Sequence, residues 1–69
     1  EKFTKELFRR VKEPDKWTIF TGPYSILISE MPEFNLKARR IKPTEYLQEC
    51  PEIETEIRGK FWWIRRRRG

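Results

Sequence analysis

The stretch that decides the fold is EIETEIRGKFWWIR, residues 52–65. Its first half alternates glutamate with isoleucine or threonine, which is the two-residue period of a strand with one buried face. Gly59-Lys60 follows as a two-residue loop with glycine first, as a type II′ hairpin turn requires. This loop places Ile57 opposite Trp62 on an apolar face. The stretch therefore predicts a β-hairpin.

The other face of this hairpin combines charges with aromatic rings. Its cross-strand pairs are Arg58 with Phe61, Glu56 with Trp63, Glu54 with Arg65 and Glu52 with Arg67. Opposite charges meet twice, which favours this register. The alternative loop, Arg58-Gly59, would set Glu56 against Phe61, and we prefer the first register.

Upstream of the hairpin, the chain begins with the pattern of an amphipathic helix over residues 2–12. The apolar side chains at Phe3, Leu7, Phe8 and Val11 fall on one helical face. Pro14 ends this helix, because the residue before a proline avoids the α-helical region.

Between this helix and the hairpin, the pattern indicates more strands and one short helix. Residues 17–21 and 24–30 are rich in β-branched and aromatic side chains and predict a first hairpin around Gly22-Pro23. Residues 34–42 alternate and predict a third strand, with Phe34, Leu36 and Ala38 facing inward. Pro43-Thr44 then opens a helix, with Thr44 as its cap, that ends before Pro51.

The expected fold class is therefore α+β: an N-terminal helix and about five antiparallel strands, with a short helix between strands 3 and 4. That order suits an OB- or SH3-like barrel. A twisted open sheet with the first helix packed across it fits equally well. We expect one small domain over residues 1–69, with a basic C-terminal end at 65–69.

Composition excludes several kinds of protein. The 69 residues include 16 Lys or Arg against 11 Asp or Glu, a net charge of +5, no histidine and one cysteine. One cysteine excludes an internal disulfide and favours an intracellular compartment, cytoplasmic or nuclear, in a host or a viral setting. Without histidine, a structural zinc site lacks its four ligands. The longest apolar run, residues 61–64, is too short to span a membrane, so we expect no membrane partner.

The candidate binding site is the aromatic and basic face of the C-terminal hairpin. Arginines that alternate with rings suit nucleic acid, because bases stack on the rings while guanidinium groups contact phosphates. The arginine run at the chain end extends this face, and basic side chains of residues 34–42 add charge. The predicted nucleic-acid-binding residues are Arg58, Phe61, Trp63, Arg65, Arg66, Arg67, Arg68, Lys37 and Arg39.

Other functions have weaker support. We expect no enzyme, no cofactor and no metal: cross-strand arginines account for Glu52, Glu54 and Glu56, and the spacing of Tyr46, Glu45 and Arg58 demands no catalysis. The alternative function is a small protein-interaction or inhibitor module, a type that includes many viral proteins. Such a module docks on a larger partner through the same surface or an edge strand. Homodimerisation is a further option. The expected nucleic-acid partner is DNA or RNA.

Overall fold

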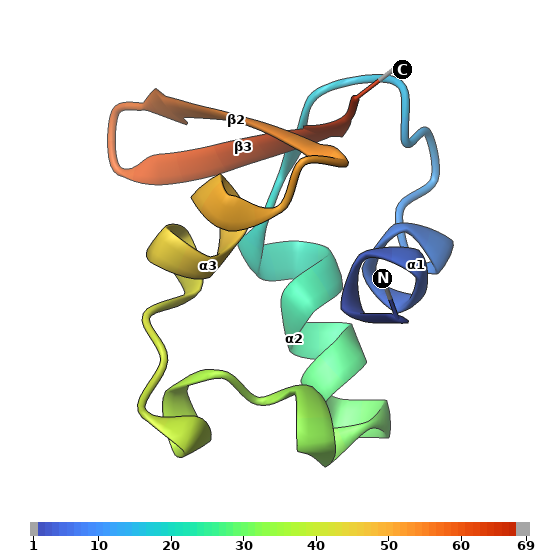
Figure 1. Ribbon diagram of the computed structural model, residues 1–69. Helices are drawn as coiled ribbons and strands as arrows, with labels where there is room; N and C mark the ends of the chain where they lie inside the picture. The colour runs from blue at the N-terminus through green and yellow to red at the C-terminus, as the bar shows by residue number, and fades with distance from the viewer. Residues whose placement is uncertain (1, 68–69) are drawn as a thin grey trace.

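The computed structural model describes residues 2–67 and shows three α-helices and three strands among them (Figure 1). The elements in chain order are α1 (Lys2–Arg9), β1 (Thr18–Ile19), α2 (Thr21–Glu30), two short 3₁₀ turns (Pro32–Phe34 and Lys37–Arg39), α3 (Pro43–Glu49), β2 (Ile53–Arg58) and β3 (Phe61–Arg66). The fold class is α+β, but the expectation of about five strands and a barrel is wrong. The sheet is open and antiparallel, with the strand order β1-β3-β2.

The C-terminal hairpin has the predicted register. Ile57 pairs with Trp62, Arg58 with Phe61, and Glu54 with Arg65. Gly59 has a φ of 62°, which glycine adopts without the steric cost that a Cβ brings. The short strand β1 pairs with the other side of β3, so that β3 is central and β2 lies at an edge.

Helix α1 is confirmed, with a shorter span than predicted. It ends at Arg9, and all four residues of its predicted apolar face are buried: Phe3, Leu7, Phe8 and Val11. Arg10 follows the helix and donates to the carboxylates of Glu6, at 3.1 Å, and of Glu30, at 2.7 Å. The hydrogen bond from Arg10 lowers the pKa of the Glu6 carboxyl below its ordinary value. Because Glu30 is the last residue of α2, Arg10 ties α1 to α2.

The predicted first hairpin over residues 17–30 is wrong. Only Thr18–Ile19 is a strand, and Thr21–Glu30 is helical. The apolar residues of this segment fit both the helical and the strand repeat. Tyr24, Leu27 and Met31 recur at helical spacing, while the isoleucines also suit a strand. Pro23 lies in the first turn of α2, where a missing backbone N–H costs little.

The predicted third strand over residues 34–42 is also wrong. Two 3₁₀ turns replace it, and the Asn35 side chain accepts a hydrogen bond from the Ala38 N–H at 3.2 Å. Arg40 has a φ of 60°, which an extended strand does not allow. Leu36 is buried as predicted, whereas Ala38 is exposed. Turn residues such as Asn35, whose side chain bonds to the local backbone, compete with the strand that the alternating pattern predicted.

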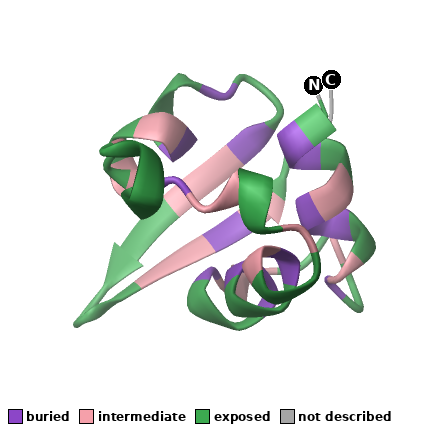
Figure 2. Cartoon of the chain, turned by 90° about the horizontal axis from the view of Figure 1, so that it is seen from below, coloured by how far each residue is buried: buried purple, intermediate pink, exposed green. Residues whose placement is uncertain are grey.

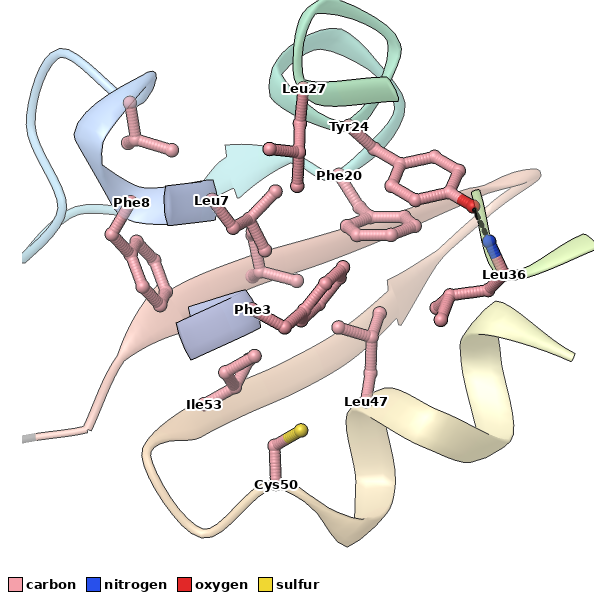
Figure 3. Close-up of a cluster of buried hydrophobic side chains, with 12 residues drawn as sticks. Phe3, Leu7, Phe8, Phe20, Tyr24, Leu27, Leu36, Leu47, Cys50 and Ile53 are labelled. Atoms are coloured by element: carbon pink, nitrogen blue, oxygen red, sulfur yellow. Dashed lines mark hydrogen bonds between the residues drawn. The ribbon is translucent and has the colours of Figure 1, made fainter. Parts of the chain in front are cut away.

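The helix expected from residue 43 is confirmed as α3, and it closes the core. Leu47 and Cys50 are buried, and the helix ends before Pro51. The predicted Thr44 cap is not formed, because the chain enters the helix at Lys42 without a side-chain cap. The core joins all three helices to the hairpin (Figure 3). Within it the Tyr24 hydroxyl accepts a hydrogen bond from the Leu36 N–H at 2.8 Å.

The three helices lie on one side of the sheet, below it in Figure 1. The hairpin is buried at its base and exposed at its tip, as Figure 2 shows: Ile53 is 2% exposed, whereas Ile57 is 60% exposed. None of the helices among residues 2–67 has the length and apolar character that crossing a membrane requires. The fold therefore leaves one sheet face and the hairpin tip accessible.

Candidate nucleic-acid interface

Four of the nine predicted site residues lie on the sheet face turned away from the helices. Along β3, Ile64 faces the core, so alternation turns Phe61, Trp63 and Arg65 to the opposite face. Their cross-strand partners Arg58, Glu56 and Glu54 share that face. The structure thus gathers Arg58, Phe61, Trp63 and Arg65, as the predicted register implied. Trp63 is partly exposed and lies outside the core cluster, whereas Trp62 packs against the core.

Two indole rings and two guanidinium groups form a stacked cluster on this face. The Arg58 guanidinium carbon lies 5.1 Å from the ring centroid of Trp63 and 5.4 Å from that of Trp17. The Arg65 guanidinium carbon lies 4.5 Å from the Trp17 centroid. Each such contact is worth about 0.5–1 kcal/mol where solvent reaches it. The rings and the arginines are therefore held in place before any ligand binds.

Carboxylates on the same face neutralise both arginines. Arg65 pairs with Glu54 at 3.2 Å across the strands, and Arg58 pairs with Glu56 at 2.8 Å. The middle of the face thus has stacking surface and balanced charge. Among the described residues, no three His, Cys, Asp or Glu side chains lie close enough to hold a metal ion.

The basic end of the chain is partly engaged within the fold. Arg66 pairs with Asp15 at 3.0 Å, and the Arg67 side chain donates to the Pro51 carbonyl at 2.9 Å. Both residues are exposed. Arg68 lies outside the described residues. Arg66 is on the face opposite Arg65, so the arginine run does not continue one surface.

The remaining predicted residues, Lys37 and Arg39, lie on the second 3₁₀ turn and not on a strand. The fold nevertheless brings Lys37 to the hairpin tip, where it lines a cleft together with Lys60 and Phe61. Arg39 is exposed and is not part of that cleft. Within the described part of the chain, Lys37 and Lys60 form no ion pair. Uncompensated positive charge therefore lies at the tip, next to a phenyl ring that is 51% exposed.

Sequence reasoning missed Trp17 and Lys60 as members of this site. Trp17 precedes β1, which pairs with β3, and this pairing brings its ring to Arg65 and Arg58. The sequence pattern placed Lys60 only in the Gly59-Lys60 turn of the hairpin. We name the whole set the hairpin surface: Trp17, Lys37, Arg58, Lys60, Phe61, Trp63 and Arg65.

A catalytic grouping of Tyr46, Glu45 and Arg58 is not brought together. Glu45 and Tyr46 line a shallow depression beside α3 that does not include Arg58. The Tyr46 ring packs against Phe3 at 5.1 Å between centroids, and Arg58 lies against the indoles. Cys50 is buried, and its thiol donates to the Tyr46 carbonyl at 3.3 Å.

Comparison of the chain with protein-family models, with curated proteins and with solved structures finds no match.

Proposed function

We propose that this domain binds nucleic acid, without catalysis, through the hairpin surface. The observation that carries the proposal is the uncovered sheet face, on which Trp17 and Trp63 are stacked with guanidinium groups. Lys37 and Lys60, which form no ion pair within the described part of the chain, lie at the hairpin tip. Bases stack on aromatic rings and on guanidinium planes, and this interaction does not depend on base identity. The function is thus binding with little sequence preference.

The distribution of charge indicates where phosphates bind. Arg58 and Arg65 have carboxylate partners, so their main contribution is a flat stacking surface. Lys37 and Lys60 have no such partner, and each releases a condensed counterion when it contacts a phosphate. The nucleic-acid strand therefore runs over the hairpin tip. Its phosphates contact Lys37 and Lys60, and its bases stack against the sheet face.

Helix α3 argues against recognition of a duplex through its major groove. The order of α2 and α3 followed by a hairpin resembles that of helix-turn-helix domains, in which the second helix enters the major groove. The connection here is longer than the usual 3–4 residues, since it spans residues 31–42. The exposed side chains of α3 include Glu45 and Glu49, which repel phosphates. The hairpin surface is the better candidate.

A protein partner is the second candidate, and one observation favours it. Strand β2 lies at the edge of the sheet, and Ile57 near its end is 60% exposed. Edge strands bind extended peptides by adding a strand, and alternate side chains supply specificity. The charged glutamates of β2 oppose this, because charge on an edge strand discourages pairing.

The test uses two double variants with the same net charge. Lys37→Gln with Lys60→Gln removes two charges from the tip, whereas Lys5→Gln with Lys12→Gln removes two exposed charges elsewhere that form no ion pair within residues 2–67. Tryptophan fluorescence is titrated with a ten-nucleotide oligothymidylate from low salt to about 0.15 M. For single strands each phosphate contact contributes a slope of about −0.7 in log K against log salt.

The tip variant should lower the magnitude of that slope by about 1.4 and weaken binding at about 0.15 M salt roughly tenfold. The control variant should bind as the wild type does. Quenching should persist at about 0.15 M, because stacking is not screened by salt. Equal losses in both variants, without quenching, would leave only generic charge attraction and would favour the protein partner.

A further inference from the structure

An apolar cleft of about 190 Å³ lies at the hairpin tip, between three parts of the fold. Phe61 and Trp62 line it from β3, Phe20 from the residue before α2, and Thr44 from the first turn of α3. Lys37 and Lys60 stand at the same cleft. All of its lining belongs to the described residues.

The lining combines two properties that one ligand must match. Four of the nine lining residues are aromatic, and two of these, Phe20 and Tyr24, are buried and stacked at 4.8 Å between centroids. The two lysines carry positive charge without a carboxylate partner in the described chain. An occupant therefore needs a flat apolar part for the walls and negative charge beside it.

We propose that this cleft receives one unstacked base of a single-stranded nucleic acid, with the adjacent phosphates at Lys37 and Lys60. The proposal rests on the proposed function and extends it by naming the strand state of the ligand. The cleft is smaller than the 300 Å³ at which pockets for drug-sized ligands begin, so it takes one ring system and leaves sugar and phosphate outside. Phe61 at the rim then stacks on that base or its neighbour.

This arrangement excludes a paired duplex as the preferred ligand. A base inside a duplex enters a pocket only after it is unpaired and unstacked, which costs a few kcal/mol. A single strand avoids most of that cost. Binding should therefore favour a single strand by tenfold or more over a duplex of equal length, since 1.4 kcal/mol corresponds to a factor of ten.

The first experiment needs only the wild-type chain and three probes at about 0.15 M salt: a ten-nucleotide oligothymidylate, the same strand with alternate abasic positions, and a ten-base-pair duplex. We expect the abasic strand to bind at least fivefold more weakly than the intact strand, although its phosphates are unchanged. Equal affinity for the intact strand and the duplex, with weaker binding of the abasic strand, would overturn the base pocket and leave the proposed function standing. Equal affinity for all three probes would also overturn the stacking of bases on the sheet face. No binding of any probe would overturn both.

A second experiment fills the cleft. Thr44→Leu adds an apolar side chain at the cleft wall, and Ser25→Leu adds the same side chain at an exposed position of α2 outside it. The first variant should reduce the preference for the intact strand over the abasic strand, with an unchanged salt slope. The second should match the wild type. Full retention of the base preference in Thr44→Leu, in a chain with wild-type circular dichroism, would refute the placement of the base.

Discussion

Replacing Phe61 with leucine separates ring stacking from ordinary apolar packing at the hairpin tip. Phe61 is 51% exposed, and it pairs across the hairpin with Arg58. Leucine is similar in volume and stays apolar, so the substitution removes the aromatic face and little else. Tryptophans 17, 62 and 63 remain and report binding by fluorescence.

The two expected effects differ in size. Volume-conserving substitutions in a fully buried core lower the free energy of unfolding by less than about 1.5 kcal/mol. Because Phe61 is half exposed, we expect a loss of less than about 1 kcal/mol. A 69-residue domain has a total stability of about 3.5–10 kcal/mol, so the variant stays folded. Loss of one stacked base costs about 1–3 kcal/mol, which weakens binding about 5- to 140-fold.

The assay is a fluorescence titration with single-stranded oligothymidylate at about 0.15 M salt, together with urea unfolding of each variant. Phe61→Tyr keeps the ring and should bind within about twofold of the wild type. Ile57→Ala is the matched control, because Ile57 is 60% exposed at the same tip but on the opposite face. Wild-type affinity in Phe61→Leu, or an equal loss in Ile57→Ala, would refute a stacking role for Phe61.

Three further results follow from the structure. Serine at all three of residues 66–68 should weaken binding to every oligonucleotide sequence alike and reduce the salt slope, measured by the same titration; unchanged affinity removes the arginine run from the site. Leu27→Ala, at a fully buried position, should cost about 2–5 kcal/mol in urea unfolding, and a cost below about 1 kcal/mol would contradict its place in the core. The lowered pKa of Glu6 means that its ion pair with Arg10 stabilises the fold above the ordinary glutamate pKa and is lost as the pH falls through the lower folded value. The melting temperature of Glu6→Gln should therefore lie below that of the wild type at pH 7 and approach it as the pH falls below the ordinary glutamate pKa; a constant difference would contradict this linkage.

The parts of the fold that sequence predicted correctly depend on near neighbours in the chain. The C-terminal hairpin needs only the Gly59 turn and the alternation on either side of it, so its register followed from residues 52–65. Helix α1 needs only the spacing of Phe3, Leu7 and Phe8. The same register also placed Trp63 on the face with Arg65, which is the centre of the candidate interface.

The segment from residue 20 to residue 42 could not be predicted in this way. Its apolar residues fit a strand and a helix alike, and the helix wins because Leu27 and Tyr24 then reach a shared core with Phe3 and Leu36. That core takes residues from α1, α3 and the hairpin as well, which are distant in the chain. The tertiary structure therefore decided the number of strands.

The binding face and its position in the fold have different origins. Sequence alone determined the hairpin, its register and its basic and aromatic side chains, because strand alternation is a local property of the backbone. Only the tertiary structure brought Lys37 to Phe61 and Trp17 to Arg58, since these pairs come from separate parts of the chain. The cleft at the tip exists for the same reason: its walls come from α2, α3 and β3, which meet only when the core between them is packed.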